Sequence, residues 1–233
     1  MFARHDLVWL TGRGWERVRE AAPLDALEAL DLWQGGGWPA VVRRAEIDLP
    51  PNEVAIGFAL PPRRAGDPKG GKGGKLRVGC RVDLADIGRR TRALPLVGAL
   101  DAVPPQWQQG LAALEREAAD AGIGLAVYGS VALEALTGQR YLTPRSDIDL
   151  LLRPLSRAQL MAGLALLARH ALTLPLDGEV VFADGRAVAW KELQAAFASA
   201  PGTRVLAKGL ERIALVPPDE LIATLEETTT WLN

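Results

Sequence analysis

Two aspartates one residue apart, Asp147 and Asp149, are the residues of this chain whose type and spacing are best suited to chemistry. They lie in the segment 145–152 (RSDIDLLL), whose polar–apolar alternation predicts a β-strand. Side chains at positions i and i+2 of a strand point to the same face, with Cα atoms about 6.6 Å apart. Two carboxylates in that arrangement suit shared coordination of Mg²⁺, a cation that takes oxygen ligands.

A second feature lies about twenty residues earlier, where the apolar run 125–128 is interrupted by Gly129 and Ser130 and continues as a helical pattern. Such a turn at the start of a helix offers backbone N–H groups and a hydroxyl to a phosphate. A phosphate-binding turn followed by a carboxylate pair indicates phosphoryl or nucleotidyl transfer. The alternative is an amphipathic edge strand in water, and the apolar residues 150–152 argue against it because they continue the strand into a core.

The elements that must position these residues fall into two parts, which divide near Pro104 and Pro105. Residues 1–104 are expected to form a β-rich domain, and residues 105–233 an α/β catalytic domain, giving an α+β protein. The first part has expected strands at 41–44, 54–60 and 76–82, a helix at 17–32 with Leu24 on its apolar side, and a basic, glycine-rich loop at 63–75. In the second part, helices are expected at 106–121, 131–136, 157–170, 191–198 and 218–232, with Ser156 capping the third. Its expected strands are 124–128, 146–152, 203–207 and 212–216, and a hairpin joins 180–182 to 186–190 through a type I′ turn at Asp184-Gly185.

The composition excludes several classes of protein. With 27 basic and 28 acidic residues in 233, the net charge of −1 argues against a nucleic-acid binder, which usually carries a basic excess. Cys80 is the single cysteine, so no internal disulfide can form, which fits a reducing compartment. The sequence has no secretory-signal pattern and no apolar run of about 20 residues. We therefore expect a cytoplasmic protein that binds no membrane.

The Gly-Ser turn followed by Ser-Asp-Ile-Asp-Leu resembles the nucleotidyltransferase superfamily typified by DNA polymerase β. That resemblance covers residues 125–181 and implies a small mixed sheet flanked by helices, with a third acidic residue on a later strand. A resemblance over nearly the whole chain is to the phosphoribosyl-dephospho-CoA transferase of malonate decarboxylase, also called its holo-acyl-carrier-protein synthase. The segments that carry it are 4–10 (RHDLVWL), 37–44 (GWPAVVRR), 143–150 (TPRSDIDL), 177–182 (DGEVVF) and 187–192 (AVAWKE).

The family resemblance implies a reaction and its partners. The expected activity is transfer of 2′-(5″-phosphoribosyl)-3′-dephospho-CoA from its triphosphate precursor, triphosphoribosyl-dephospho-CoA, to a serine of the acyl carrier protein of malonate decarboxylase, with release of pyrophosphate. Mg²⁺ is the expected cofactor, bound by Asp147 and Asp149, while Gly129 and Ser130 hold the donor phosphates. Arg145 either neutralises triphosphate charge or is an ordinary surface arginine. The basic loop 63–77 either docks an acidic carrier or is simply solvated.

Some assignments stay open at the level of sequence. The third carboxylate is Glu179, slightly favoured because an apolar triplet follows it, or Asp177 on the other side of Gly178. Lys191 and Lys208 can reach phosphates, although most lysines are solvated. The acceptor can instead be a citrate-lyase-type carrier, a small molecule or another protein hydroxyl, and a non-catalytic nucleotide-binding module is the alternative of a different class. A homodimer is the common case among oligomers.

Overall fold

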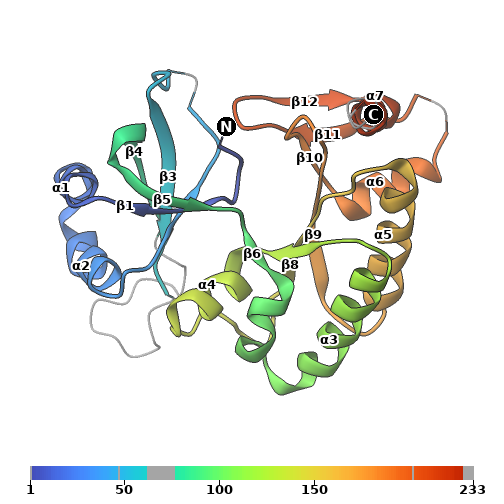
Figure 1. The fold of residues 1–233 in the computed structure, drawn as a ribbon, viewed down its shortest axis with the longest axis horizontal. Coiled ribbons are helices and arrows are strands. Elements are labelled where there is room, and N and C mark those ends of the chain that lie inside the picture. The colour runs from blue at the N-terminus through green and yellow to red at the C-terminus, as the bar shows by residue number, and fades with distance from the viewer. Residues whose placement is uncertain (1, 47, 62–76, 201, 228–233) are drawn as a thin grey trace. The chain divides into compact units, whose positions relative to one another are not determined.

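The computed structural model describes residues 2–46, 48–61, 77–200 and 202–227, so residues 63–76 of the predicted basic loop 63–77 lie outside the described residues. The chain divides into two compact units, one made of the residues up to Ala93 with Leu136–Tyr141, the other of Leu94–Ala135 with the residues from Leu142 onward. Each unit is built around its own sheet, and each also contains helices (Figure 1). The predicted α+β class is confirmed.

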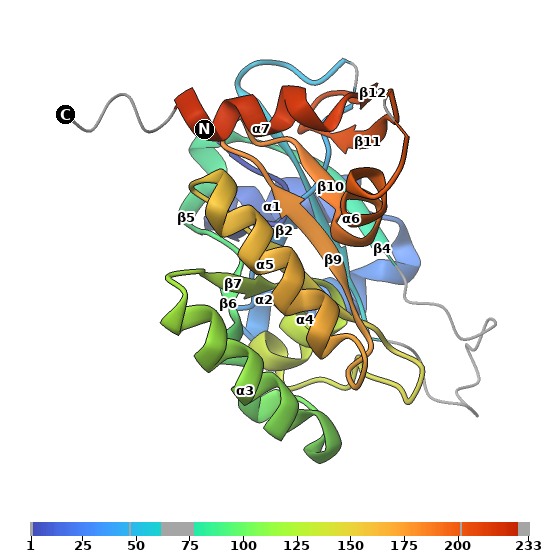
Figure 2. The same cartoon turned by 90° about the vertical axis from the view of Figure 1, so that its right-hand side faces the viewer.

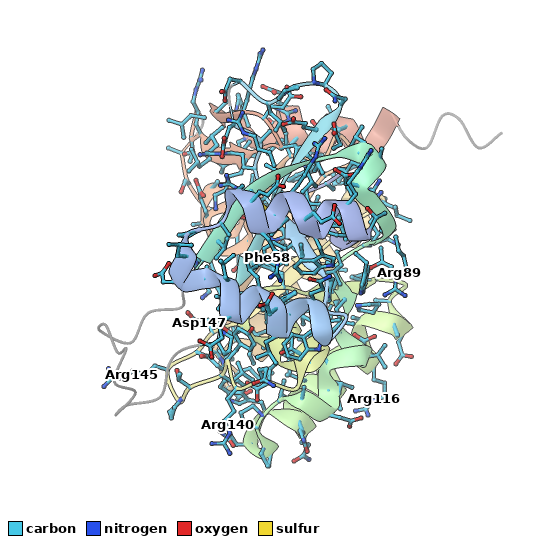
Figure 3. All side chains as sticks on the ribbon, turned by 90° about the vertical axis from the view of Figure 1, so that its left-hand side faces the viewer. Phe58, Arg89, Arg116, Arg140, Arg145 and Asp147 are labelled. Atoms are coloured by element: carbon cyan, nitrogen blue, oxygen red, sulfur yellow. The ribbon has the colours of Figure 1, made fainter. Side chains whose placement is uncertain are left out.

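The first unit holds a five-stranded antiparallel sheet with strand order β4-β3-β2-β1-β5. Aromatic side chains pack together in its core. The rings of Trp15 and Trp33 lie 5.4 and 5.8 Å from the ring of Phe58, the residue labelled in Figure 3. Cys80 is also buried, and burial raises the pKa of its thiol to about 12. The strands are β1 (Leu7–Leu10), β2 (Ala40–Val42), β3 (Glu53–Ala59), β4 (Arg77–Asp83) and β5 (Ile87–Thr91), with a 3₁₀ turn η2 (Leu84–Asp86) before β5.

The single helix predicted over residues 17–32 is wrong, because the chain forms two helices there. Helix α1 (Gly12–Ala21) ends before Pro23, and α2 (Leu27–Gly35) begins after a 3₁₀ turn, η1 (Leu24–Ala26). Proline lacks an N–H and disfavours helical backbone in the residue before it, so the helix stops there. Leu24, which the sequence pattern placed on the apolar side of one continuous helix, lies in the 3₁₀ turn instead and is 87% exposed.

The second unit contains a seven-stranded mixed sheet with strand order β12-β11-β10-β9-β8-β7-β6. The pair β8–β9 is parallel, and the other pairs of this sheet are antiparallel. Strand β6 and the 3₁₀ helix η3 (Leu96–Ala102), which precede residue 104, belong to this unit because β6 pairs with β7. The strands are β6 (Leu94–Pro95), β7 (Leu125–Val127), β8 (Ile148–Leu152), β9 (Leu176–Val181), β10 (Ala187–Ala189), β11 (Val205–Lys208) and β12 (Ile213–Val216).

Helix α5 (Arg157–His170) connects the two parallel strands. The hydroxyl of Ser156 accepts a hydrogen bond from Gln159 N at 3.2 Å, which confirms the predicted N-cap. A Cβ built on Gly163 would come within 2.7 Å of Leu152 Cδ2, so α5 lies tightly on the face of the sheet that carries Leu152 (Figure 2). The other helices of the unit are α3 (Pro105–Asp120), which packs against α5, α4 (Gly129–Thr137), α6 (Trp190–Phe197) and α7 (Pro218–Glu227).

The hairpin between β9 and β10 is confirmed, but its predicted type I′ turn is wrong. That turn requires positive φ at both central residues. Gly185 has φ +84°, whereas Asp184 is not among the described residues with positive φ. Gly185 N donates to Phe182 O at 2.9 Å, and Phe182 N donates to Arg186 O at 2.8 Å, so the loop is one residue longer than a two-residue turn. In the described ranges, none of the helices combines the length and the apolar character needed to cross a membrane.

Candidate active site

Asp149 and Asp177 lie side by side on neighbouring parallel strands. In the register of β8 and β9, Asp149 is the direct partner of Asp177, and Leu151 is the partner of Glu179. Partners in a ladder project to the same face of the sheet, so the two aspartates share a face. Alternation along β8 places Leu150 and Leu152 on the opposite face, under α5. The carboxylates therefore lie on the sheet face that α5 leaves uncovered.

Gly129 brings the start of α4 against the carboxylate of Asp149. Its φ of +64° is left-handed, and a Cβ built there would lie 2.1 Å from Asp149 Oδ2. The preceding residue, Tyr128, donates its backbone N–H to Asp149 O at 3.1 Å. Only glycine suits this position, because any side chain would both strain the backbone and displace the carboxylate. Ser130, the next residue, is buried in the first turn of α4.

Replacing Gly129 with alanine is expected to lower the turnover number of the group transfer predicted from the sequence about 100-fold or more while the protein stays folded, because the new methyl group displaces the Asp149 carboxylate. Gly138→Ala is the matched control. Its φ is +66°, so the backbone penalty is the same, yet no heavy atom lies within 4 Å of the new Cβ. Equal activity losses in the two variants, measured beside their melting temperatures, would contradict the close approach of Gly129 to Asp149.

Asp147 is less firmly positioned than the sequence pattern predicted. Strand β8 begins at Ile148, so Asp147 precedes the strand and is exposed. The loop before it is fixed at two points: Thr143 N donates to Ser146 Oγ at 3.0 Å, and Leu142 N donates to Glu134 Oε2 of α4 at 2.7 Å. Arg145 occupies the exposed turn of this loop, and Figure 3 shows it reaching outward from the ribbon.

The two candidates for the third carboxylate differ in their surroundings. The side chain of Asp177 is 48% exposed, and Lys191 Nζ lies 3.8 Å from its Oδ1. The side chain of Glu179 is 5% exposed, and Lys208 Nζ donates to its Oε1 at 3.0 Å. The ion pair between Glu179 and Lys208 is a feature that sequence reasoning did not find, since it expected both lysines to be solvated.

The side-chain atoms of the site that could bind a metal are carboxylate oxygens, which suit a hard divalent cation. In the described part of the chain, no three His, Cys, Asp or Glu side chains are close enough to hold a metal ion by themselves. Proteins usually bind Mg²⁺ through one or two carboxylates plus substrate phosphates and water. The pair of Asp149 and Asp177, with Gly129 packed against the carboxylate of Asp149, is compatible with such a site.

Comparison with known proteins points to one family. Residues 95–219 match the family model of the phosphoribosyl-dephospho-CoA transferase MdcG C-terminal domain, and residues 3–93 match that of the corresponding N-terminal domain. A phosphoribosyl-dephospho-CoA transferase of Xanthomonas campestris pv. campestris is 36% identical over 194 residues, which are 82% of this chain and 85% of the relative. One from Bradyrhizobium diazoefficiens is 32% identical over 223 residues, 94% of this chain and 92% of the relative. No solved structure matches significantly.

Proposed function

Because the chain belongs to the phosphoribosyl-dephospho-CoA transferase family, we propose that it transfers 2′-(5″-phosphoribosyl)-3′-dephospho-CoA from triphosphoribosyl-dephospho-CoA to a serine of the acyl carrier protein of malonate decarboxylase. In this reaction the serine oxygen forms a bond to the α-phosphorus of the donor. The bond from that phosphorus to the oxygen bridging to the β-phosphorus breaks, and pyrophosphate leaves. The observation that best supports the proposal is the pairing of Asp149 with Asp177 beside the positive-φ Gly129.

Each residue of the site then has a role. Asp149 and Asp177 would hold Mg²⁺ together with donor phosphates and water, and Asp147, in the loop that precedes β8, would add negative charge on the same side of the chain. The cation would supply charge stabilisation for the triphosphate. The backbone N–H groups at Gly129 and Ser130 would orient the β- and γ-phosphates at the start of α4. Asp177, whose side chain is half-exposed, would take the proton of the attacking serine. Most of the rate enhancement would come from positioning and charge stabilisation, with no covalent enzyme intermediate.

The test is an intact-mass measurement of the apo carrier after incubation with the protein, Mg²⁺ and triphosphoribosyl-dephospho-CoA. A mass gain equal to the phosphoribosyl-dephospho-CoA unit, with one pyrophosphate released per carrier, is expected. A carrier whose acceptor serine is replaced by alanine is the control. If the unmodified carrier gains no mass while another transferase can still load it, the acceptor assignment is wrong. A citrate-lyase-type carrier, a small-molecule alcohol and another protein hydroxyl would then be compared as acceptors.

A further inference from the structure

Strand β12 is an outer strand of the seven-stranded sheet and lacks the features that usually protect such a strand (Figure 1). An outer strand presents N–H and C=O groups that another chain could pair with, and proteins shield it with charged side chains, proline, a bulge or a cover. The sequence of β12 is IALV, with neither a charge nor a proline. The other outer strands of the two described sheets are shielded: β4 by Arg77, Arg81 and Asp83, β5 by Arg89 and Arg90, and β6 by Pro95.

The side chains of β12 form an exposed apolar surface with its neighbour β11. Ile213 and Leu215 are 43% and 58% exposed, and Leu206, the partner of Leu215 in β11, is 36% exposed. The three side chains project from the same face of the sheet, because cross-strand partners and residues at i and i+2 share a face. The protein thus leaves both the backbone edge and the apolar side chains of β12 uncovered.

The backbone hydrogen bonds show which groups of β12 point outward. Gly209 N donates to Arg212 O at 2.7 Å, so these partners are hydrogen-bonded, and such pairs alternate with non-bonded pairs along an antiparallel ladder. Ile213 and Leu215 therefore occupy non-bonded positions, with their N–H and C=O groups directed away from β11. Leu215 O accepts a hydrogen bond from Arg204 Nη1 at 3.2 Å, and a carbonyl oxygen can accept a second one.

We propose that β12 pairs with β12 of a second copy of this chain, antiparallel and about a two-fold axis at Ala214. In this register Ile213 lies opposite Leu215 of the second copy, and each such pair exchanges both of its N–H···O bonds. A second copy fits better than another partner because Ile-Ala-Leu alternates large, small and large side chains in either direction. The same surface is then complementary to itself, which a two-fold dimer requires.

The dimer would join the two seven-stranded sheets into one continuous sheet. The register runs from Ile213 across β11 and β10 to Val181 of β9, which shares a face with Asp177. A two-fold axis perpendicular to the sheet keeps this face on the same side in both copies. The two pairs of carboxylates therefore lie on the same face of the joined sheet. This inference goes beyond the proposed function and does not depend on it.

Sedimentation velocity of the full chain, without donor, Mg²⁺ or carrier, tests for the dimer. Pairing through one short strand buries little surface, so we expect a Kd of about 10 µM and a mainly dimeric protein at about 100 µM. Leu215→Lys places a charge opposite Ile213 of the second copy and should raise the Kd at least about tenfold. Leu172→Lys, the same change at a leucine that is 84% exposed and lies outside β12, should leave the Kd unchanged.

Circular dichroism establishes that both lysine variants are folded. The inference is overturned if the parent is a monomer at about 100 µM, or if Leu215→Lys dimerises as tightly as the parent. It is also overturned if Leu172→Lys weakens the dimer as much as Leu215→Lys does. Neither measurement uses transfer activity, so a negative result leaves the proposed function untouched.

A disulfide cross-link tests the register. Ala214 and its counterpart would form a non-bonded pair with Cα atoms about 4.5 Å apart, which a disulfide can bridge. The two copies of Leu215 would be about 9 Å apart, which is too far. With oxidised glutathione as the oxidant, Ala214→Cys should give a covalent dimer and Leu215→Cys should not. The native Cys80 is buried and does not compete. Equal cross-linking of the two variants, or none by Ala214→Cys, would contradict the inference.

Discussion

Asp149→Asn is expected to reduce carrier modification by about 10³-fold or more without unfolding the protein. Asp149 makes more of the contacts within the site than the other acids do. It is the register partner of Asp177, its backbone O accepts a hydrogen bond from Tyr128 N, and its carboxylate lies against Gly129. An amide cannot supply the negative charge that a divalent cation needs. Losing about 4 kcal/mol of transition-state stabilisation corresponds to a rate loss of about 10³-fold.

The rate of the Asp149→Asn variant is best followed by intact mass of the carrier under single-turnover conditions, with saturating donor and Mg²⁺. Asp101→Asn, the same chemical change at an exposed position of η3, is the control and should keep the parent rate. Circular dichroism should be the same for the parent and both variants. An Asp149→Asn enzyme with more than about a tenth of the parent rate would mean that the aspartate pair is not the metal site, and the proposed mechanism would have to be replaced.

The largest loss of stability is expected for Gly178→Ala, between Asp177 and Glu179 in β9. Gly178 has φ +129°, and a Cβ built there would lie 1.9 Å from Leu150 O and 2.5 Å from Leu150 N. These are backbone atoms of the neighbouring parallel strand, so no side-chain rotation can relieve the overlap. We expect the free energy of unfolding to fall by more than about 4 kcal/mol, or the variant to be insoluble.

Urea unfolding followed by tryptophan fluorescence would measure the effect of Gly178→Ala. Gly185→Ala is its matched control, because Gly185 also has a positive φ, +84°, but no atom lies within 4 Å of its new Cβ. The control should lose only the backbone penalty of about 1–2 kcal/mol. Similar unfolding midpoints for both variants would show that β8 and β9 can separate to admit a methyl group.

Most elements of the second unit could be predicted from the sequence because each has a local signal. The Ser156 cap fixes the start of α5, and hydrophobic periodicity locates α3 and the short strands. The first unit was harder, because leucines at helical spacing continue across Pro23 and conceal the break between α1 and α2. The geometry of the Asp184-Gly185 turn was missed because the same residue pair occurs in turns of different length.

The candidate site could be predicted in its residues but not in its pairings. Gly129 and Asp149 stand out in the sequence, and the structure brings them into contact. The choice between Asp177 and Glu179 depends on the register of two parallel strands, which is set by how α5 and its loops pack, not by local spacing. The ion pair of Glu179 with Lys208 joins strands β9 and β11. The two residues are 29 positions apart in the chain, and no sequence motif predicts a contact between them.

The parallel pairing of β8 and β9 has a consequence for how the site forms during folding. Parallel neighbours cannot be joined by a tight turn, so the chain must leave the sheet, form α5 and return before Asp177 reaches Asp149. Closing a connection of that length carries an entropic cost that short hairpins avoid. A nascent chain that ends before Leu176 already has Asp149 and the Gly129 turn, but not the carboxylate of Asp177. Under the proposed mechanism, the chain gains transfer activity only once the crossover is complete, so that activity reports tertiary assembly of the second unit.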